Sequence, residues 1–202
     1  VVCLLGADME DEGPVRYAAN LTETAHMVIE LLGGEYSAPD ELPRVAAPGR
    51  PDAQVYGLFA GGTLCTEAAQ VLEGMGVAHT LLDLGADEYT RGRAHPMIDP
   101  RLRAGMVADL AGKEDVGAVL FDVILGDLAH DDPAGAVIPA LKELQATAAG
   151  PPPPIYVALI GTRRDPQGLT DQRTRLEATG AHVFAGNVAA ATAAGRSIGL
   201  AT

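Results

Sequence analysis

The stretch VGAVLFDVILG, residues 116–126, decides the fold of this chain. It is an apolar run in which Asp122 is the single charged residue, a pattern typical of a parallel strand buried on both faces. Strand and helix patterns alternate around it, and four more strands are expected at residues 54–61, 79–85, 155–161 and 182–186. This order predicts an α/β fold, a flavodoxin-like, doubly wound parallel sheet of five strands in a three-layer αβα arrangement.

Helical patterns fill the intervals between the predicted strands. Helices are expected at residues 61–76, 101–110, 132–150, 170–180 and from about Val188 onward. Asp99–Pro100 and Asp132–Pro133 each match an N-cap residue followed by proline at the first helical position. Pro139 is expected to perturb the helix that contains it, because proline lacks the backbone donor that a helix interior needs.

The composition excludes several classes of protein. Hydrophobic residues make up 48% of the 202, but aromatic residues only 4%, so the core must be built from Val, Leu, Ile and Ala. A net charge of −13 argues against nucleic acid as a partner. We find no apolar run long enough for a membrane span and no signal peptide, and Cys3 and Cys65 are too few for a disulfide framework. A cytoplasmic protein is therefore expected.

The N-terminal region differs from the rest of the chain. Residues 1–34 read as a strand at Val1–Leu5, a loop and a helix at about Leu21–Leu32, capped by Asn20 or Thr22. This order resembles that of the C-terminal region, where Asn187 matches Asn20, although chance similarity is the alternative.

Three parts are therefore expected along the chain. Residues 1–34 are interpreted as the tail of a preceding similar domain, residues 35–53 as a proline-rich linker and residues 54–202 as the main domain. Because the sequence opens inside a strand and without Met, we expect it to be a piece of a longer protein.

Ligands of open parallel sheets bind beyond the carboxyl ends of the strands, so the four loops at that edge are the candidate site. The first loop enters a helix through Gly61, Gly62 and Thr63. Free N–H groups there can hold an anion, although a tight strand–helix turn is the alternative. Glu67 is a candidate for the far half of a capping box.

The second loop, ADEYTRGRAHPMIDP, carries charges of both signs. Arg91 and Arg93 have the geometry to clamp carboxylate or phosphate oxygens, and His95 is the candidate proton donor. The alternative is a solvated loop held by salt bridges, and we assign Asp99 mostly to helix capping.

The third loop contains Asp127, His130, Asp131 and Asp132, which either bind a cation or, more in keeping with Asp132–Pro133, begin a helix. No metal-ligand spacing is recognisable, so no metal is predicted. Asp122 needs either a partner on a neighbouring strand or a site role, because a carboxylate in so apolar a strand is costly when left alone.

The second cysteine is interpreted separately. Cys65 lies in the first turn of a predicted helix, where a thiolate is favoured, but no histidine accompanies it in sequence. We therefore expect it to be a small buried apolar residue.

Four segments together resemble the FdrA family of acyl-CoA synthetase-like proteins, which is related to the succinyl-CoA ligases. They are GLFAGGTLCTEA, LDLGADEYTRGRAHPMIDPRLR, LFDVILGDLAHDDPAG and ALIGTRRDPQGL, and the resemblance spans about residues 54–195. It implies a ligase-type flavodoxin-like domain in which helix N-termini cradle a phosphate. Gly161, Thr162 and Asn187 then join Gly61, Gly62 and Thr63 in the predicted anion-binding set.

The resemblance also implies an activity. Members of this family are associated with oxamate carbamoyltransferase in purine and allantoin breakdown, and so with small anionic substrates and partner subunits or a homo-oligomer. No cofactor follows with certainty from this activity. The first alternative is an NDP-forming acyl-CoA ligase subunit, with CoA or a Mg-nucleotide as a possible cofactor; the second is a non-catalytic anion-binding or assembly domain. The loop GTRRDPQGLTDQ lacks the phosphorylated histidine of the ligases, although His95 or His130 could approach from other loops.

Overall fold

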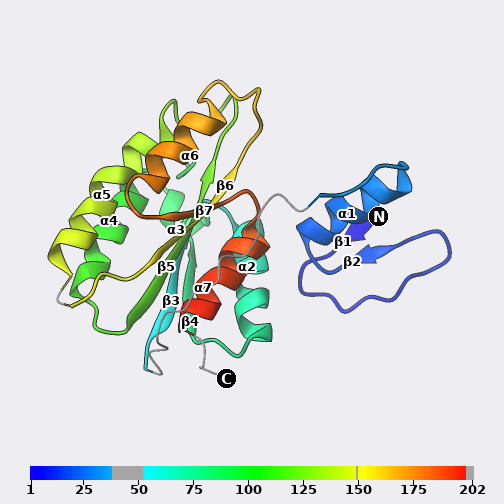
Figure 1. The fold of residues 1–202 in the computed structure, drawn as a ribbon, viewed down its shortest axis with the longest axis horizontal. Coiled ribbons are helices and arrows are strands. Elements are labelled where there is room, and N and C mark those ends of the chain that lie inside the picture. Colours follow the sequence, from blue (N-terminus) through cyan, green and yellow to red (C-terminus); the bar gives the residue numbers. More distant parts are fainter. Residues whose placement is uncertain (38–51, 149, 199–202) are drawn as a thin grey trace.

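The computed structural model describes residues 1–37, 52–148 and 150–198 (Figure 1). A parallel sheet of five strands, in the order β4-β3-β5-β6-β7, forms its centre. The strands are β3 (Gln54–Phe59), β4 (His79–Asp83), β5 (Val116–Ile124), β6 (Ile155–Ile160) and β7 (His182–Phe184). The predicted flavodoxin-like α/β fold is therefore confirmed.

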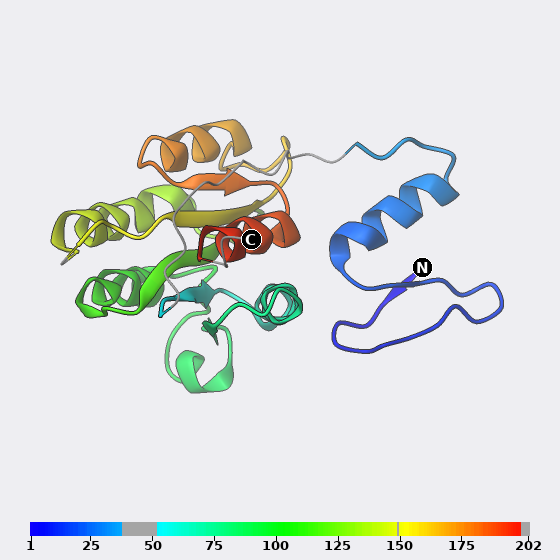
Figure 2. The ribbon, with the colours of Figure 1, turned by 60° about the horizontal axis from the view of Figure 1, so that its bottom comes forward.

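Helices cover both faces of this sheet (Figures 1 and 2). One face is covered by α2 (Gly62–Gly74) and α7 (Asn187–Ile198), and the other by α4 (Arg101–Asp109), α5 (Pro133–Thr147) and α6 (Leu169–Glu177). The short α3 (Asp87–Thr90) lies in the loop after β4, and η1 (Leu110–Gly112) continues α4.

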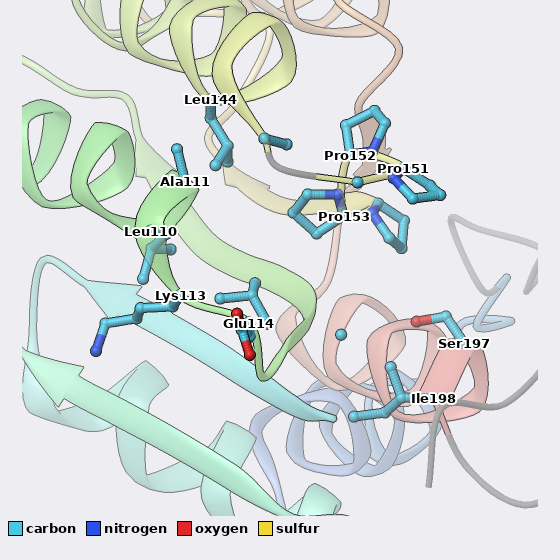
Figure 3. Close-up of a pocket in the computed structure, with 15 residues that line it drawn as sticks. Leu110, Ala111, Lys113, Glu114, Leu144, Pro151, Pro152, Pro153, Ser197 and Ile198 are labelled. Atoms are coloured by element: carbon cyan, nitrogen blue, oxygen red, sulfur yellow. The ribbon is translucent and has the colours of Figure 1, made fainter. Parts of the chain in front are cut away.

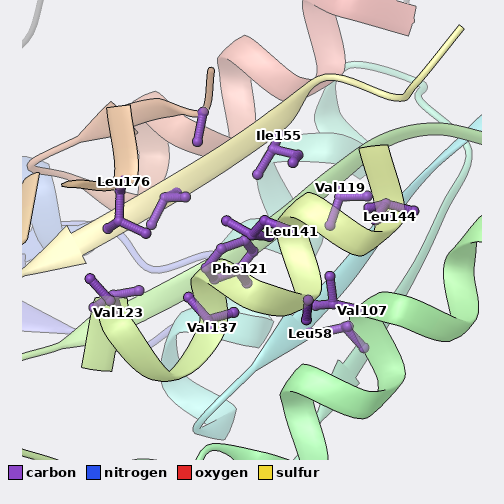
Figure 4. Close-up of a cluster of buried hydrophobic side chains, with 14 of the residues drawn as sticks. Leu58, Val107, Val119, Phe121, Val123, Val137, Leu141, Leu144, Ile155 and Leu176 are labelled. Atoms are coloured by element: carbon purple, nitrogen blue, oxygen red, sulfur yellow. The ribbon is translucent and has the colours of Figure 1, made fainter. Parts of the chain in front are cut away.

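The central strand β5 supplies both hydrophobic cores, because its side chains alternate between the two faces of the sheet. Val119, Phe121 and Val123 belong to the cluster that packs under α4 and α5 (Figure 4). Ala118 and Leu120 belong to the cluster under α2 and α7. The buried alanines of α7 are small, so this helix can pack close to the sheet. This packing agrees with a core that contains few aromatic residues.

Two details at the helices correct the sequence predictions. Pro139 lies inside α5, which runs through it from Pro133 to Thr147 without a break. The helix α4 has Pro100 rather than Asp99 as its N-cap residue, and Asp99 instead accepts hydrogen bonds from Arg101. The N-cap role of Asp132 is confirmed, because its Oδ1 accepts from the N–H of Gly135 at 3.1 Å.

The N-terminal region forms a small unit of β1 (Val2–Cys3), β2 (Tyr17–Ala18) and α1 (Leu21–Leu31). The predicted strand at residues 1–5 is thus only two residues long. Asn20 caps α1 by accepting from the N–H of Glu23 at 2.8 Å. As the sequence similarity suggests, β1 and β2 pair in parallel and are followed by Asn and a helix, as are β6 and β7.

The two ends of the sheet differ in character. At the amino ends of β5 and β6, a cavity of about 590 Å³ is lined mainly by prolines and aliphatic side chains, with Lys113 and Glu114 at its side (Figure 3). The charged loops follow the carboxyl ends of the strands.

No helix of the described residues is both long and apolar enough to cross a membrane. Most of the predicted linker, residues 38–51, lies outside the described part of the chain.

Candidate functional site

The candidate site begins where β3 runs into α2 through Ala60, Gly61 and Gly62. Gly61 is the N-cap residue, in extended conformation, and no side chain of the described residues caps this helix. The first N–H groups of α2 therefore lack a side-chain acceptor and carry the partial positive charge of a helix N-terminus. Thr63 is exposed beside them, so the turn has the donors that an oxyanion needs.

A buried ion pair between Asp122 and Arg103 holds this turn in place. Asp122, at the end of β5, accepts from the Ala60 N–H at 2.9 Å and from Arg103 Nη1 at 2.7 Å. Arg103 comes from α4, and the same nitrogen also binds the Asp122 carbonyl at 2.6 Å. Burial raises the pKa of the Asp122 carboxyl, although the Arg103 charge opposes the rise. Asp122 is thus paired, but the expectation of a partner on a neighbouring strand is wrong for the cation, which comes from the helix α4.

A second carboxylate, that of Asp83, lies beside the N-terminus of α2. Asp83, at the end of β4, accepts from the N–H of Gly85 at 2.9 Å through Oδ1. Its Oδ2 would lie only 2.9 Å from a Cβ atom placed on Gly62, so the glycine makes room for this carboxylate. A Cβ on Gly85 would meet the Ala60 carbonyl at 2.5 Å and His95 Nε2 at 2.7 Å. The ends of β3 and β4 and the second loop therefore meet at Gly85.

His95 has a defined orientation at this meeting point. Its Nδ1 accepts from the N–H of Met97 at 3.3 Å, which in the neutral ring leaves the proton on Nε2. Because Nε2 is the ring atom near Gly85, a neutral His95 directs a donor toward the turn that opens α2. The role of His95 as a catalytic proton donor stays a prediction.

Cys65, in the first turn of α2, is poorly suited to act as a nucleophile. Burial, together with the nearby charges of Asp83 and Asp122, raises the pKa of its thiol to about 11. The thiol therefore stays protonated near neutral pH, in line with the sequence expectation of a small apolar residue.

The two predicted clamp residues lie further out. Arg91 and Arg93 are exposed, and within the described part of the chain neither side chain forms a hydrogen bond or ion pair. Arg93 lines an open groove of about 570 Å³ together with Asp99 and Arg101, whereas His95 and Arg91 are not part of its wall. Arg93 therefore lines a groove to which His95 does not contribute.

Hydrogen bonds join the loops after β4, β5 and β6 into one surface. The N–H of His130 donates to the Met97 carbonyl at 2.8 Å, which ties the third loop to the second. Gln167 ties the fourth to the third, because its Nε2 donates to the carbonyls of Gly126 and His130 while its Oε1 accepts from the Gly126 N–H. His130 Nδ1 accepts from the N–H of Asp132 at 3.0 Å.

Two carboxylates of these loops are held in their charged form. Hydrogen bonds from the Arg101 side chain lower the pKa of Asp99 to about 2. Hydrogen bonds from Arg175, at 2.7 and 2.8 Å, hold the pKa of Asp132 well below its usual range. Both acids therefore act as structural ion-pair partners, and no group of three or more His, Cys, Asp or Glu within the described residues is arranged to hold a metal ion.

The loop after β6 is closed on itself. The Thr162 N–H donates to Asp165, and the Thr162 hydroxyl accepts from the Arg164 N–H at 3.2 Å. A Cβ on Gly161 would lie within 2.9 Å of the Leu125 side chain, so that glycine serves close packing. An anion at Gly161 and Thr162 would therefore have to displace Asp165 from the Thr162 N–H.

Asn187 and Glu67 form a buried pair beside the site. Asn187 Nδ2 donates to Glu67 Oε2 at 2.9 Å and to the Leu64 carbonyl at 2.9 Å. Glu67 Oε1 accepts from the Leu21 N–H, the first of α1, at 2.8 Å. Glu67 therefore joins α2 to the starts of α1 and α7, and its predicted capping-box role is wrong.

Sequence reasoning missed Arg103, Asp83 and the bridging role of Glu67. The signal for Arg103 was Asp122 itself, because a carboxylate in an apolar strand requires a cation that another element must supply. Asp83 had no comparable signal, since a charged residue at the end of a strand is ordinary. The partners of Glu67 are too far away in sequence for any local pattern to reveal them.

Comparisons with known proteins give a consistent result. A family model described as CoA-ligase matches residues 58–197. Among curated proteins, the uncharacterized protein YahF of Escherichia coli (strain K12) is 32% identical over 209 residues. That alignment covers 87% of this chain and 41% of YahF, so the chain spans less than half of that relative.

Solved structures with the same fold belong to larger proteins. PH0766 from Pyrococcus horikoshii OT3 has a TM-score of 0.56 at 14% identity, over 87% of this chain and 43% of its own. The dinucleotide-forming acetyl-coenzyme A synthetase 1 of Ca. Korarchaeum cryptofilum, in its apo form, has a TM-score of 0.53 at 13% identity, over 74% and 33%. At such identities the likeness concerns the fold alone.

Proposed function

This chain belongs to the CoA-ligase family, and we propose that it is an FdrA-type, acyl-CoA synthetase-like subunit that acts on an acyl or carbamoyl phosphate. The observation that carries the proposal is the uncapped N-terminus of α2, entered through Gly61 and Gly62 and fixed by Asp122. Backbone donors held rigidly by a buried ion pair are suited to the oxygens of a phosphoryl group.

The specific reaction that we propose is carbamoyl transfer to oxamate. The amide nitrogen of oxamate attacks the carbamoyl carbon of carbamoyl phosphate, the bond from that carbon to the phosphate oxygen breaks, and phosphate leaves. The attacking nitrogen loses one proton, and the leaving phosphate takes one up. In this scheme the α2 N–H groups hold the phosphate, His95 Nε2–H donates toward the departing oxygen, and Arg91 and Arg93 hold the oxamate carboxylate.

The exposure of the two arginines bears on this scheme. Arg91 and Arg93 are exposed and would need to turn inward in order to share a substrate with His95. An incomplete site of this kind is consistent with a subunit that acts with partner chains or with further copies of itself. We further propose that residues 1–34 are the tail of a preceding domain of the same fold, since β1, β2 and α1 repeat the order of β6, β7 and α7.

Acyl-CoA ligation is the second candidate, and family membership is the observation that favours it. CoA and a Mg-nucleotide would then be substrates, as in NDP-forming ligases. The loop of residues 161–168 contains no histidine to carry a phosphoryl group, which weighs against this reaction for the chain by itself. A non-catalytic role in anion binding or assembly is the third candidate.

Thermal unfolding with a panel of ligands separates the three candidates. Phosphate, carbamoyl phosphate, oxamate, CoA and Mg-ATP are added singly, because a ligand at about 100 times its dissociation constant adds about 2.7 kcal/mol of stability. A rise of several degrees with carbamoyl phosphate or oxamate, but not with CoA, is the expected result. A response to CoA favours the ligase, and no response to any of the five contradicts the catalytic proposals.

Two arginine variants test the clamp within the same assay. Arg91→Ala and Arg93→Ala should abolish the response to oxamate but retain that to phosphate, which the α2 turn holds. Arg196→Ala, in the last turn of α7, is the matched control for loss of an exposed positive charge. An undiminished oxamate response in both clamp variants would remove the arginines from the scheme.

A further inference from the structure

A crevice of about 600 Å³ lies between α1 and the N-terminal turns of α2 and α7. These three helices lie side by side in Figure 1. The larger side chains that line the crevice are aliphatic, and they come from Leu21, Ile29, Leu64, Ile160 and Val188. The volume falls within the range of small-molecule sites, whose walls are typically apolar.

The crevice offers a ligand no free charge. Among the described residues that line it, none is Lys, Arg or His, and Glu67 is the one acid. Glu67 is 1% exposed, and its two carboxylate oxygens accept from the Leu21 N–H and from Asn187 Nδ2. The other polar side chains are mostly hydroxyls, those of Thr22, Tyr36, Ser37 and Thr192. Because an ionised group would find no counter-charge here, the part of a ligand that enters the crevice is uncharged.

The crevice adjoins the turn that opens α2. Leu64 and Glu67 both line it, and their spacing places them on neighbouring positions of one helix face. Gly61 precedes Leu64 by the same spacing, at the start of that face. A Cβ atom placed on Gly61 meets nothing within 4 Å, so the space beside this glycine is open. A ligand can therefore extend from the N–H groups of the turn, past Gly61, to the wall formed by Leu64.

The far wall of the crevice lies at the same edge of the sheet. Ile160 is the last residue of β6, and Val188 follows β7 in the first turn of α7. One strand, β5, separates β6 from β3, the strand that leads into Gly61. The ends of β3 and β6 are therefore about 10 Å apart, a distance that one small molecule can span.

We propose that this crevice holds the aliphatic chain of an acyl phosphate whose phosphate is bound by the α2 turn. The inference rests on the proposed function and extends its substrates from carbamoyl phosphate, which has no chain, to acyl groups of several carbons. An aliphatic chain is uncharged and gains affinity when the crevice removes it from water. An acyl group that ends in a second carboxylate is disfavoured, because its charge would lie unpaired among Ile29, Leu64 and Ile160.

Phosphate esters that differ in chain length test this inference on the full chain. Isothermal titration calorimetry compares inorganic phosphate, methyl phosphate, hexyl phosphate and 6-phosphonooxyhexanoate, which adds a terminal carboxylate to the six-carbon chain. Hexyl phosphate should bind at least about tenfold more tightly than methyl phosphate, since each buried methylene adds about threefold in affinity. The terminal carboxylate should abolish this gain.

The outcomes separate the inference from the proposed function. Equal affinities for methyl and hexyl phosphate, or an undiminished gain with 6-phosphonooxyhexanoate, overturn the inference while phosphate binding at the α2 turn stands. Failure of all four compounds to bind contradicts the proposed function as well.

A pair of variants on α1 tests the location. Ala25→Trp fills the crevice from an exposed position in its lining, whereas Val28→Trp places the same side chain at an exposed position outside the lining. Circular dichroism first verifies that both variants keep the fold. The preference for hexyl over methyl phosphate should be lost in Ala25→Trp and kept in Val28→Trp, with inorganic phosphate bound equally by both. A preference that persists in Ala25→Trp contradicts the assignment of the chain to this crevice.

Discussion

Arg103 Nη1 lies 2.7 Å from Asp122 Oδ1 and 2.6 Å from the Asp122 carbonyl oxygen, and neither side chain is more than 3% exposed. The pair links α4 to β5 and, through the Ala60 N–H, to the turn that opens α2. Arg103 Nε and Asp122 Oδ2 have no partner among the described residues. A buried ion pair with unsatisfied atoms costs stability. Such costly arrangements are more typical of functional sites than of a core that only stabilises the fold.

Breaking this pair from one side should be more damaging than removing it. Arg103→Met leaves the Asp122 carboxylate buried beside only one donor and should lower the free energy of unfolding by about 3–5 kcal/mol. The double variant Arg103→Met/Asp122→Leu should lose less than Arg103→Met alone, because no buried charge is left behind. Urea unfolding of the single and double variants measures both values.

An exposed ion pair supplies the control. Arg101→Met, which removes the partner of Asp99, should change stability much less than Arg103→Met, because solvent screens the exposed Arg101 charge. Equal losses for Arg101→Met and Arg103→Met would contradict the role given to burial.

The Asp132–Arg175 pair predicts a pH dependence of stability. The pKa of Asp132 is lower in the folded than in the unfolded chain, so its contribution is present above the unfolded value and is lost as the pH falls. Asp132→Asn keeps an N-cap acceptor for α5 but loses the charge that Arg175 binds. The stability difference between the two proteins should therefore be large at pH 6 and shrink steadily below about pH 4.

Thermal unfolding between pH 2 and pH 7 follows this difference, with Asp127→Asn as the control at an exposed acid of the same loop. A difference that stays constant with pH, or grows toward acid, would assign the effect of Asp132→Asn to packing rather than to charge.

The sequence predicted the architecture because the relevant signals are local. The apolar run of β5, the glycines around α2 and the Asp132–Pro133 start of α5 each depend on a few neighbouring residues. Pro139 was misjudged because tertiary packing keeps α5 helical through a residue that lowers local helix stability. The predicted N-cap of α4, Asp99, was wrong by one residue. The N-cap is Pro100, and Asp99 forms an ion pair with Arg101.

The site was less accessible to such reasoning. The edge rule selects the loops at the carboxyl ends of the strands, and within them Gly62 lies beside Asp83 while His95 and Asp83 both lie beside Gly85. Which side chains face inward depends on contacts across the fold, as in Asp122 with Arg103. Arg91 and Arg93 are exposed, so the clamp inferred from charge density in the sequence stays a prediction.

The two glycines that open α2 should respond differently to substitution. A Cβ on Gly61 meets nothing within 4 Å, and its extended backbone suits any residue. A Cβ on Gly62 lies 2.9 Å from Asp83 Oδ2, so this carboxylate must move. Gly61→Ala should therefore leave stability within about 0.5 kcal/mol, whereas Gly62→Ala should lower it by about 1–3 kcal/mol. Chemical unfolding of the matched pair measures this; equal effects would mean that Asp83 adapts without cost.

The Asp83 carboxylate stands at the place where an anion would approach α2, so it should weaken anion binding. Two negative charges about 5 Å apart at a protein surface repel each other by a few kcal/mol at most, and solvent reduces this further. Asp83→Asn keeps the acceptor for the Gly85 N–H while removing the charge. Phosphate should then bind about tenfold more tightly, as isothermal titration calorimetry measures directly.

The opposite outcome would be equally informative about the site. Asp87→Asn, at an exposed position of the same loop, controls for the change in net charge and should leave phosphate affinity nearly unaltered. Weaker phosphate binding in Asp83→Asn would mean that Asp83 contributes to binding, through a shared proton or a bound cation. The α2 turn would then be a site for a protonated or cation-paired phosphate rather than for the free anion, since backbone donors alone would not account for the loss.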